Sequence, residues 1–300
     1  MIIQDLVKKN IINPPKWLPD NVVYLILGGS NLYGVSPEDS DQDITGFCIP
    51  PKDDVFPHLK GEIQGFGRQK NRFENWQHHN VIDNNALGGK GREYDFSIYS
   101  IVRYFSLAMA NNPTTMEILW APENCVLHCT PIGRLIRENR NIFPSKKIRH
   151  TYLGYAFNQV KKAKSQERTG KRKDIVDKYG FDVKFASHVV RLLNQGISFL
   201  TTGDVDLQAD KEILKSVRRG EWTLERIEEY LHEREQEMSK LYIDSSLPYA
   251  PDEAKIKDLL IECLNLHYKD IDSSCVVVPS QAESALRAIK ETVDKYYGKN

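Results

Sequence analysis

The stretch from residue 22 to residue 43 constrains the fold more than any other part of the sequence. Six consecutive apolar residues, Val22–Leu27, have the length and composition of a buried strand, and the turn Gly28-Gly29-Ser30 follows them directly. Glycines leave backbone N–H groups unblocked, and Ser30 adds a hydroxyl donor. The turn therefore either reverses the chain as a hairpin or binds an anion such as a phosphate.

Asp41 and Asp43 follow this turn and are separated by one residue. On a strand both side chains point to the same face, about 7 Å apart, where they repel each other unless a cation or solvent lies between them. A solvated turn is the simpler interpretation of such a pair. The apolar run at 44–49 instead indicates that the pair begins a buried strand, and Mg²⁺ favours carboxylates combined with phosphate oxygens and water.

Metal sites built on two aspartates commonly take a third acid from a neighbouring strand. Asp95 lies between Tyr94 and Phe96, in the alternating pattern of a strand, and is the preferred candidate. Glu93 has the same strand-face parity and stays open as the alternative.

The order of predicted elements indicates an α+β fold. Strands are expected at 22–27, 44–49, 64–66, 77–82 and 93–96, with an exposed loop at 83–91. Ser97 or Ser100 should cap a helix that runs to residue 111, and residues 114–117 fit a capping box. After about residue 130 helical periodicity dominates, with helices expected at 148–166, 181–201, 210–219, 223–241, 253–268 and 281–297. We therefore predict a mixed domain at 1–130 and a helical domain at 131–300.

Composition limits the partners and the compartment. With 41 basic and 41 acidic residues the net charge is zero, so any nucleic-acid surface must be local. The local candidate is a basic run, for which a solvated helix face is the default interpretation: Lys161, Lys162, Lys164, Arg168, Lys171, Arg172 and Lys173. No apolar stretch approaches the length of a membrane span, and the N-terminus does not resemble a secretory signal. Five irregularly spaced cysteines favour reduced thiols and a cytoplasmic location.

A second group of polar residues lies on one face of the predicted helix at 181–201. Lys184, His188 and Arg191 are spaced i, i+4 and i+7, so their side chains share a face. Two permanent cations and a histidine that titrates near neutral pH suit a triphosphate. From spacing alone, a solvated helix face is the better interpretation of these three residues. The presence of the acid pair upstream reverses this preference and favours a triphosphate-binding face.

The pattern G-G-S-x-x-Y-G, followed after five residues by S-D-x-D, resembles the signature of the DNA polymerase β superfamily of nucleotidyltransferases. The segments at 112–120, 184–193, 200–203 and 246–248 are similar to those of the RNA-ligase-associated polymerases and their bacterial and phage relatives. This resemblance spans residues 20–265. Arg103 and Glu117 also resemble family positions, although a partner for an acid and a helix cap are their simpler roles.

The resemblance implies that Asp41, Asp43 and Asp95 bind Mg²⁺, with Mn²⁺ as an alternative, and act in catalysis. It also implies that Gly29 and Ser30 hold a nucleoside triphosphate, which Lys184, His188 and Arg191 would help to bind. The expected reaction moves a nucleoside monophosphate to an acceptor hydroxyl and releases pyrophosphate. RNA, a protein and a small molecule stay open as acceptors, and the nucleotide and the oligomeric state stay undetermined.

The competing hypothesis is a non-catalytic nucleotide-sensing or nucleic-acid-binding module on the same fold. Such a module would keep the glycine turn and lack one catalytic acid. The position of Asp95 relative to Asp41 and Asp43 separates the two hypotheses.

Overall fold

The computed structural model describes residues 1–36, 40–55, 72–165 and 169–269, together with 286, 288–290 and 293. The chain separates into two compact units, Met1–Cys263 and Leu264–Asn300, and the description below concerns the first. The domain boundary predicted near residue 130 lies inside this unit and stays a prediction. The strand predicted at 64–66 and most of the helix predicted at 281–297 lie outside the described residues.

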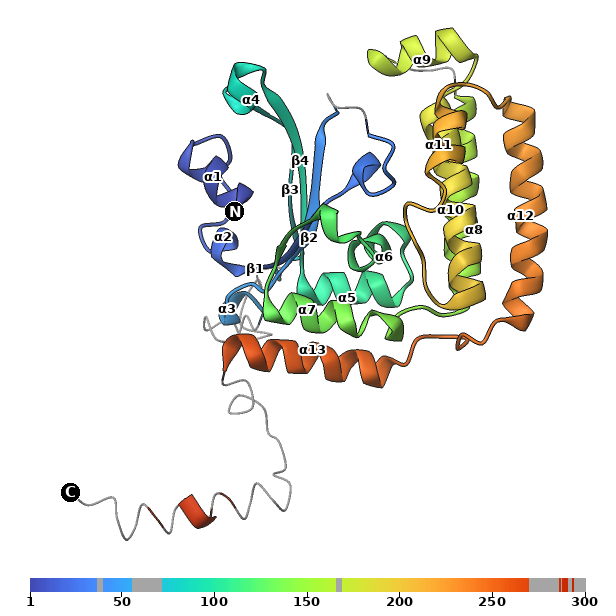
Figure 1. Ribbon diagram of the computed structural model, residues 1–300. Coiled ribbons are helices and arrows are strands. Elements are labelled where there is room, and N and C mark those ends of the chain that lie inside the picture. The colour runs from blue at the N-terminus through green and yellow to red at the C-terminus, as the bar shows by residue number, and fades with distance from the viewer. Residues whose placement is uncertain are drawn as a thin grey trace, which may run out of the picture. The chain divides into compact units, whose positions relative to one another are not determined.

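A five-stranded mixed sheet, in the order β3-β4-β2-β1-β5, organises this unit (Figure 1). Strands β2 and β4 are parallel, and the other neighbouring pairs are antiparallel. The α+β prediction is confirmed, and β2 begins at residue 42, so that Asp43 lies inside the sheet. The strands are β1 (Val22–Leu27), β2 (Gln42–Cys48), β3 (Asn75–Asp83), β4 (Arg92–Ser100) and β5 (Val126–Cys129).

Both faces of the sheet are packed. Helices α1 (Ile2–Lys8) and α2 (Leu18–Asn21) contribute Ile3, Leu6 and Leu18 to a core cluster that includes Ile44 and Phe96 of the sheet. Stacked rings mark a second packed layer, in which Phe47 of β2 lies 5.7 Å from the ring of Tyr24 and 4.4 Å from that of Tyr104. The strands that carry the acids are therefore held in a rigid core.

The loop predicted at 83–91 is more ordered than expected. Asp83 is buried at the end of β3 and forms an ion pair of 2.6 Å with Lys9, and the helical turn α4 (Ala86–Gly89) connects β3 to β4. The paired carboxylate ties the N-terminal segment to the sheet.

Short helices follow β4, and their caps correct one prediction. Ser100 caps α5 as predicted, because its hydroxyl accepts a hydrogen bond from the Arg103 N–H. The capping box at 114–117 is wrong, because Asn112 caps α6 and accepts from the Thr114 N–H. The elements after β4 are α5 (Ile101–Met109), α6 (Pro113–Leu119), η3 (Glu123–Cys125), α7 (Pro131–Glu138) and η4 (Arg140–Ile142). A further short helix, α3 (Lys52–Val55), lies between β2 and β3 in the sequence.

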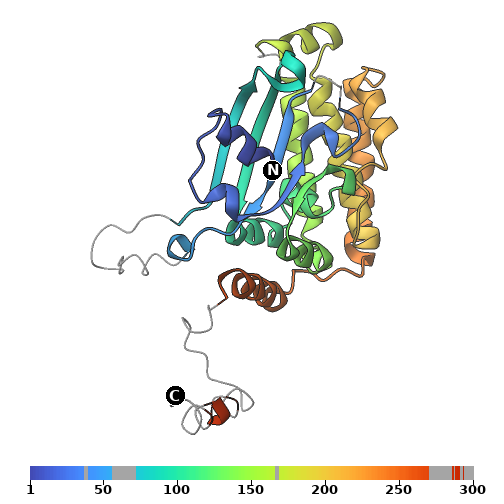
Figure 2. The ribbon, with the colours of Figure 1, turned by 60° about the vertical axis from the view of Figure 1, so that its left-hand side comes forward.

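The later part of the unit is helical, as predicted. Helices α8 (Ile148–Lys164), α10 (Val183–Thr202) and α12 (Leu224–Asp244) pack against one another beside the sheet (Figures 1 and 2). Helices α9 (Lys171–Tyr179), α11 (Lys211–Arg218) and α13 (Glu253–Tyr268) complete the series, and α9 begins inside the basic run. Among the helices described, none has the length and apolar character needed to cross a bilayer.

Candidate functional site

The glycine turn lies directly against the acid pair. The Gly28 N–H donates to the Asp43 carbonyl at 2.6 Å, and a Cβ on Gly29 would lie 1.8 Å from Asp43 Oδ2. Gly29 also has a φ of +58°, which favours glycine. A single 3₁₀ turn, η1 (Gly29–Asn31), forms here, so the anion donors are backbone N–H groups and Ser30 without a long helix dipole.

The third acid lies beside the second. Parallel pairing of β2 with β4 puts Asp95 in register with Asp43, whereas Glu93 precedes the part of β4 that pairs with β2. Neighbouring strands are about 4.8 Å apart, so the two aspartates point from adjacent strands to one face. Burial raises the pKa of Asp43, and the charges of Asp95 and Asp41 raise it further. This half-buried carboxylate therefore carries negative charge that its surroundings do not neutralise.

A bulge in β3 orients Asp95. Pairing with β4 shifts between His78 and Val81, and Asn80 has a φ of +55°. In this conformation the Asn80 N–H donates to Asp95 Oδ1 at 2.7 Å, and His79 Nδ1 lies 3.5 Å from the same oxygen. Bulges commonly re-aim groups beside functional sites. Sequence reasoning missed this contact because bulges leave little trace in a strand pattern.

A cavity of about 520 Å³ opens beside the turn and the acids. Ser30, Ser40 and Asp41 line it from the sheet side, and Lys184 from the start of α10. The lining also includes a set that sequence reasoning missed, namely Asp174, Ile175, Lys178 and Tyr179 of α9 and Arg218 of α11. Residues far apart in sequence thus surround one space of the size that small-molecule ligands need.

Arg218 is the most informative of the missed residues. Its guanidinium donates to the Val35 carbonyl at 3.1 Å and to Ser187 Oγ at 3.4 Å, and both acceptors are uncharged. Burial, followed by the charges of Arg191 and Arg172, lowers its pKa. One signal could have identified it: Arg218 is four residues after the buried Leu214, on the inward face of α11.

Lys184 is held at the first turn of α10 by the buried cap Asp182. That carboxylate accepts from the N–H groups of Lys184 and Phe185 at 3.0 and 3.2 Å, and it forms an ion pair of 2.7 Å with Arg172. The Lys184 side chain is partly exposed. Partial burial of this side chain, followed by the charges of Arg172 and Arg218, lowers the pKa of Lys184. The charges of Asp41 and Asp43 oppose this shift. Its amine thus feels the charges of both the acid pair and the arginines.

Arg191 does not line this cavity. Its guanidinium forms a buried ion pair with Glu117, donates to Tyr33 Oη at 2.7 Å and lies 4.5 Å from the centre of that ring. The Tyr33 hydroxyl in turn donates to Glu117 Oε2. Arg191 therefore connects Tyr33, which lies three residues after the glycine turn, to α6, and this differs from the triphosphate contact expected from its helical spacing.

His188 also lies outside the large cavity. With Tyr33, Arg191 and Arg218 it lines a separate space of about 10 Å³, enough for roughly one water molecule. Burial, followed by the charges of Arg218, Arg172 and Lys184, lowers the pKa of His188 to about 4. The expected titration near neutral pH is therefore wrong, since a neutral imidazole prevails there.

The lowered pKa predicts a specific pH dependence of stability. Between about pH 6.5 and pH 4 the unfolded state binds a proton at His188 that the folded state does not, so stability falls as the pH falls. We expect a loss of about 3 kcal/mol from this group between pH 7 and pH 4. Urea unfolding of His188→Asn should show a weaker pH dependence than the wild type, whereas His150→Asn, at an exposed site, should not. An unchanged dependence in His188→Asn would contradict a neutral imidazole.

The acids fit a divalent cation only in combination with a substrate. Within the described residues, no group of three or more His, Cys, Asp or Glu side chains is arranged to hold a metal ion. Asp43 and Asp95 are nevertheless in register, and burial, followed by the charge of Asp95, raises the pKa of Asp43. Two carboxylates supplemented by phosphate oxygens and water form a usual Mg²⁺ environment.

Comparison with known proteins identifies the family. The sequence model of the RlaP family, the RNA repair pathway DNA polymerase beta family, matches residues 6–247, which is most of the chain. The match includes the glycine turn, all three candidate acids and the cavity described above.

Two individual proteins show weaker similarity. An uncharacterized 38.9 kDa protein from the nrdC-mobD intergenic region of Enterobacteria phage T4 is 28% identical over 136 residues, which cover 45% of this chain and 36% of the phage protein. The chain thus matches well under two thirds of that relative's length. A nucleotidyltransferase-like protein from Exiguobacterium sibiricum matches over 80% of this chain and 73% of its own, with 9% identity and a TM-score of 0.28.

Proposed function

The chain belongs to the RlaP family of polymerase-β-type nucleotidyltransferases, and we propose that it transfers a nucleoside monophosphate from a nucleoside triphosphate to an acceptor hydroxyl with the help of Mg²⁺. One observation carries the proposal. Asp43, in register with Asp95, lies against the glycine turn, and Ser30 of that turn lines a cavity together with Asp41, Lys184 and Arg218.

We assign the triphosphate to this cavity. The N–H groups of the turn and the Ser30 hydroxyl donate to phosphate oxygens, and Lys184 and Arg218 supply positive charge. The helical spacing predicts that His188 and Arg191 contact phosphate, but in this proposal neither residue contacts the triphosphate. His188 adds no charge near neutral pH, and Arg191 supports Tyr33.

We assign cation binding and acceptance of the hydroxyl proton to the three acids. Asp41, Asp43 and Asp95 would hold the cation, which supplies neutralisation of phosphate charge and a lowered pKa for the acceptor hydroxyl. The acceptor oxygen forms a bond to the α-phosphorus as the bond to the β-phosphate oxygen breaks, and pyrophosphate leaves. We assign the hydroxyl proton to Asp95 Oδ2, because Oδ1 already accepts from the Asn80 N–H.

An RNA 3′ hydroxyl is the acceptor that we propose, and its support is the description of the family as an RNA repair family. The basic run supports it only weakly. Arg172 is ion-paired with Asp182, Lys164 with Glu228, and Lys162 lies 5.6 Å from the Phe185 ring. A cytoplasmic location belongs to the same proposal, since the cysteines in the described ranges are unpaired thiols.

Removing the Lys184 amine should weaken triphosphate binding. A charge-assisted hydrogen bond contributes about 1.5–3 kcal/mol, so Lys184→Ala should raise the Kd by roughly 10- to 100-fold. Lys215→Ala is the matched control, because that amine forms an exposed ion pair with Glu212 on the neighbouring α11. Calorimetric titration with each of the four triphosphates in Mg²⁺ measures both. Equal affinities in the two variants would remove Lys184 from the binding site.

The whole proposal is tested by incubating the protein with each α-labelled triphosphate, Mg²⁺ or Mn²⁺, and one acceptor class at a time. Label transfer to RNA that requires a free 3′ hydroxyl supports the proposal. Transfer to protein alone would instead identify a nucleotidylating enzyme. Triphosphate binding without transfer to any acceptor would favour the non-catalytic module.

A further inference from the structure

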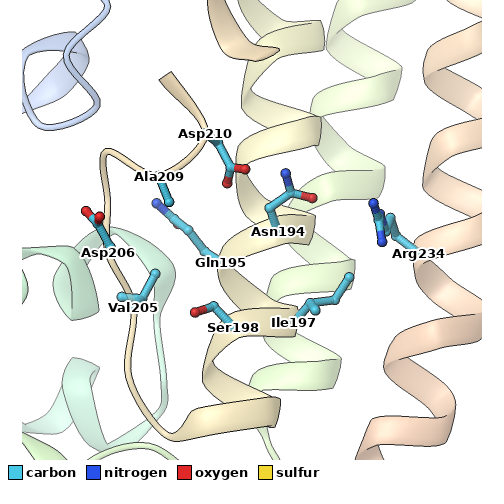
Figure 3. Close-up of a pocket in the computed structure, with 9 residues that line it drawn as sticks. All are labelled: Asn194, Gln195, Ile197, Ser198, Val205, Asp206, Ala209, Asp210 and Arg234. Carbon is cyan, nitrogen blue, oxygen red and sulfur yellow. The ribbon is translucent and has the colours of Figure 1, made fainter. Parts of the chain in front are cut away.

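A second pocket, of about 280 Å³, lies between the middle of α10, the segment that leads into α11, and α12. Figure 3 shows the side chain of Gln195 pointing from α10 toward the segment that carries Ala209 and Asp210, with Arg234 of α12 on the other side. Gln195 is 11 residues along α10 from Lys184, a separation of about 16 Å. The proposed triphosphate cavity shares no lining residue with this pocket.

The amide of Gln195 is the unusual feature of this pocket. The residue is only 3% exposed, and among the described contacts neither its Nε2 nor its Oε1 has a hydrogen-bond partner. Leaving a buried polar group unpaired is costly, and native proteins rarely do so without a ligand or water. An unpaired amide presents one acceptor and two donors side by side.

The other polar groups of the pocket are partly engaged. Asn194 Oδ1 accepts from the Tyr230 hydroxyl at 2.6 Å, and the Asn194 side chain also bonds to Asp210. Burial raises the pKa of Asp210, and Asn194 and Arg234 oppose this. The Asp210 carboxylate is therefore incompletely solvated and can accept further N–H or O–H donors.

The charges argue against a phosphorylated ligand. Asp206 and Asp210 give the pocket two carboxylates, whereas the guanidinium of Arg234 is paired with Glu237. The Arg234 Nε is buried without a partner among the described contacts and offers a further donor. Ser198 and the apolar side chains of Ile197, Val205 and Ala209 complete the lining. Such a site suits a flat, uncharged molecule rich in hydrogen-bond donors.

We propose that this pocket binds an unphosphorylated nucleoside, with the base edge on Gln195 and the sugar hydroxyls toward Asp210. A glutamine amide forms two parallel hydrogen bonds with a base edge that has a donor beside an acceptor. The volume is close to the lower end of ligand pockets. This site would be separate from the triphosphate cavity, and its occupation does not depend on catalysis.

The test is titration calorimetry of the full chain with adenosine, guanosine, cytidine and uridine, in the presence of a saturating non-hydrolysable triphosphate. We expect at least one nucleoside to bind with a Kd below about 1 mM, and Gln195→Leu to weaken it at least tenfold. Gln236→Leu, at an exposed glutamine of α12, should bind as the wild type does. Asp210→Asn provides a second variant from the opposite wall, and thermal melting verifies that each variant folds.

Three results would overturn the proposal. The first is that no nucleoside binds the wild type. The second is binding that folded Gln195→Leu and Asp210→Asn both retain at full strength. The third is binding that the triphosphate analogue abolishes, which would assign the nucleoside to the larger cavity. A Gln195→Leu protein that melts several degrees higher, combined with a wild type that binds no nucleoside, would identify the pocket as filled by water.

Discussion

Asp43→Asn is expected to lower the rate of nucleotidyl transfer by at least about 10³-fold while the protein stays folded. Charge stabilisation at a phosphoryl transfer site contributes several kcal/mol, and each 1.36 kcal/mol corresponds to a tenfold rate change. Asparagine keeps the shape that packs against Gly29 and removes the negative charge. Initial rates of pyrophosphate release in Mg²⁺ measure the effect.

Melting temperatures in the absence of metal provide the control for folding. The pKa of Asp43 is higher in the folded state than in the unfolded state. The folded protein therefore binds more protons at this carboxylate when the pH lies between the two pKa values, and stability falls as the pH rises through that range. At pH 7 Asp43→Asn should therefore melt no lower than the wild type. Mg²⁺ with a triphosphate should raise the melting temperature of the wild type more than that of the variant.

The variants Asp95→Asn and Glu93→Gln separate the two candidates for the third acid. Each substitution replaces a carboxylate by the corresponding amide on the same face of β4, but only Asp95 is in register with Asp43. We expect Asp95→Asn to lose activity as Asp43→Asn does, and Glu93→Gln to stay within about threefold of the wild type. The reverse order would move the proton acceptor to Glu93, and full activity of Asp43→Asn would contradict the assignment of the acid pair.

The parts of the site that sequence reasoning located depend on local geometry. Side-chain alternation along a strand predicts that Asp41 and Asp43 share a face. The structure places Asp43 inside β2, whereas Asp41 immediately precedes the strand. The sequence favours Asp95 over Glu93 only through the alternation of apolar residues around it. The pairing that places Asp95 beside Asp43 is the register of β2 with β4, two strands that are some 50 residues apart in the chain.

The remaining parts depend on tertiary contacts that no spacing encodes. Lys184, His188 and Arg191 do share one helical face, but three different environments meet that face: an open cavity, a space for about one water molecule, and a buried carboxylate. Arg218 and Arg219 are adjacent in sequence, yet one points inward and the other pairs with Glu221 at the surface. Only packing distinguishes such neighbours.

The role of Arg191 gives the second large expected effect. Arg191→Ala should destabilise the protein by about 3–5 kcal/mol, because it leaves the Glu117 carboxylate buried without its cation. For a unit of this size the melting temperature should fall on the order of 10 °C. Glu117→Ala should have a similar effect. Chemical denaturation and thermal melting at pH 7 measure both.

A double variant separates a structural contact from a contact with the nucleotide. Arg191→Met combined with Glu117→Leu removes both charges and keeps the volume, so it should be more stable than either alanine variant. Because Tyr33 loses both charged partners in this double variant, the glycine turn should become less well positioned, and the rate of transfer should fall more than the triphosphate affinity. The opposite pattern for Arg191→Ala, an unchanged melting temperature with a Kd raised tenfold, would return Arg191 to the triphosphate site that its spacing first predicted.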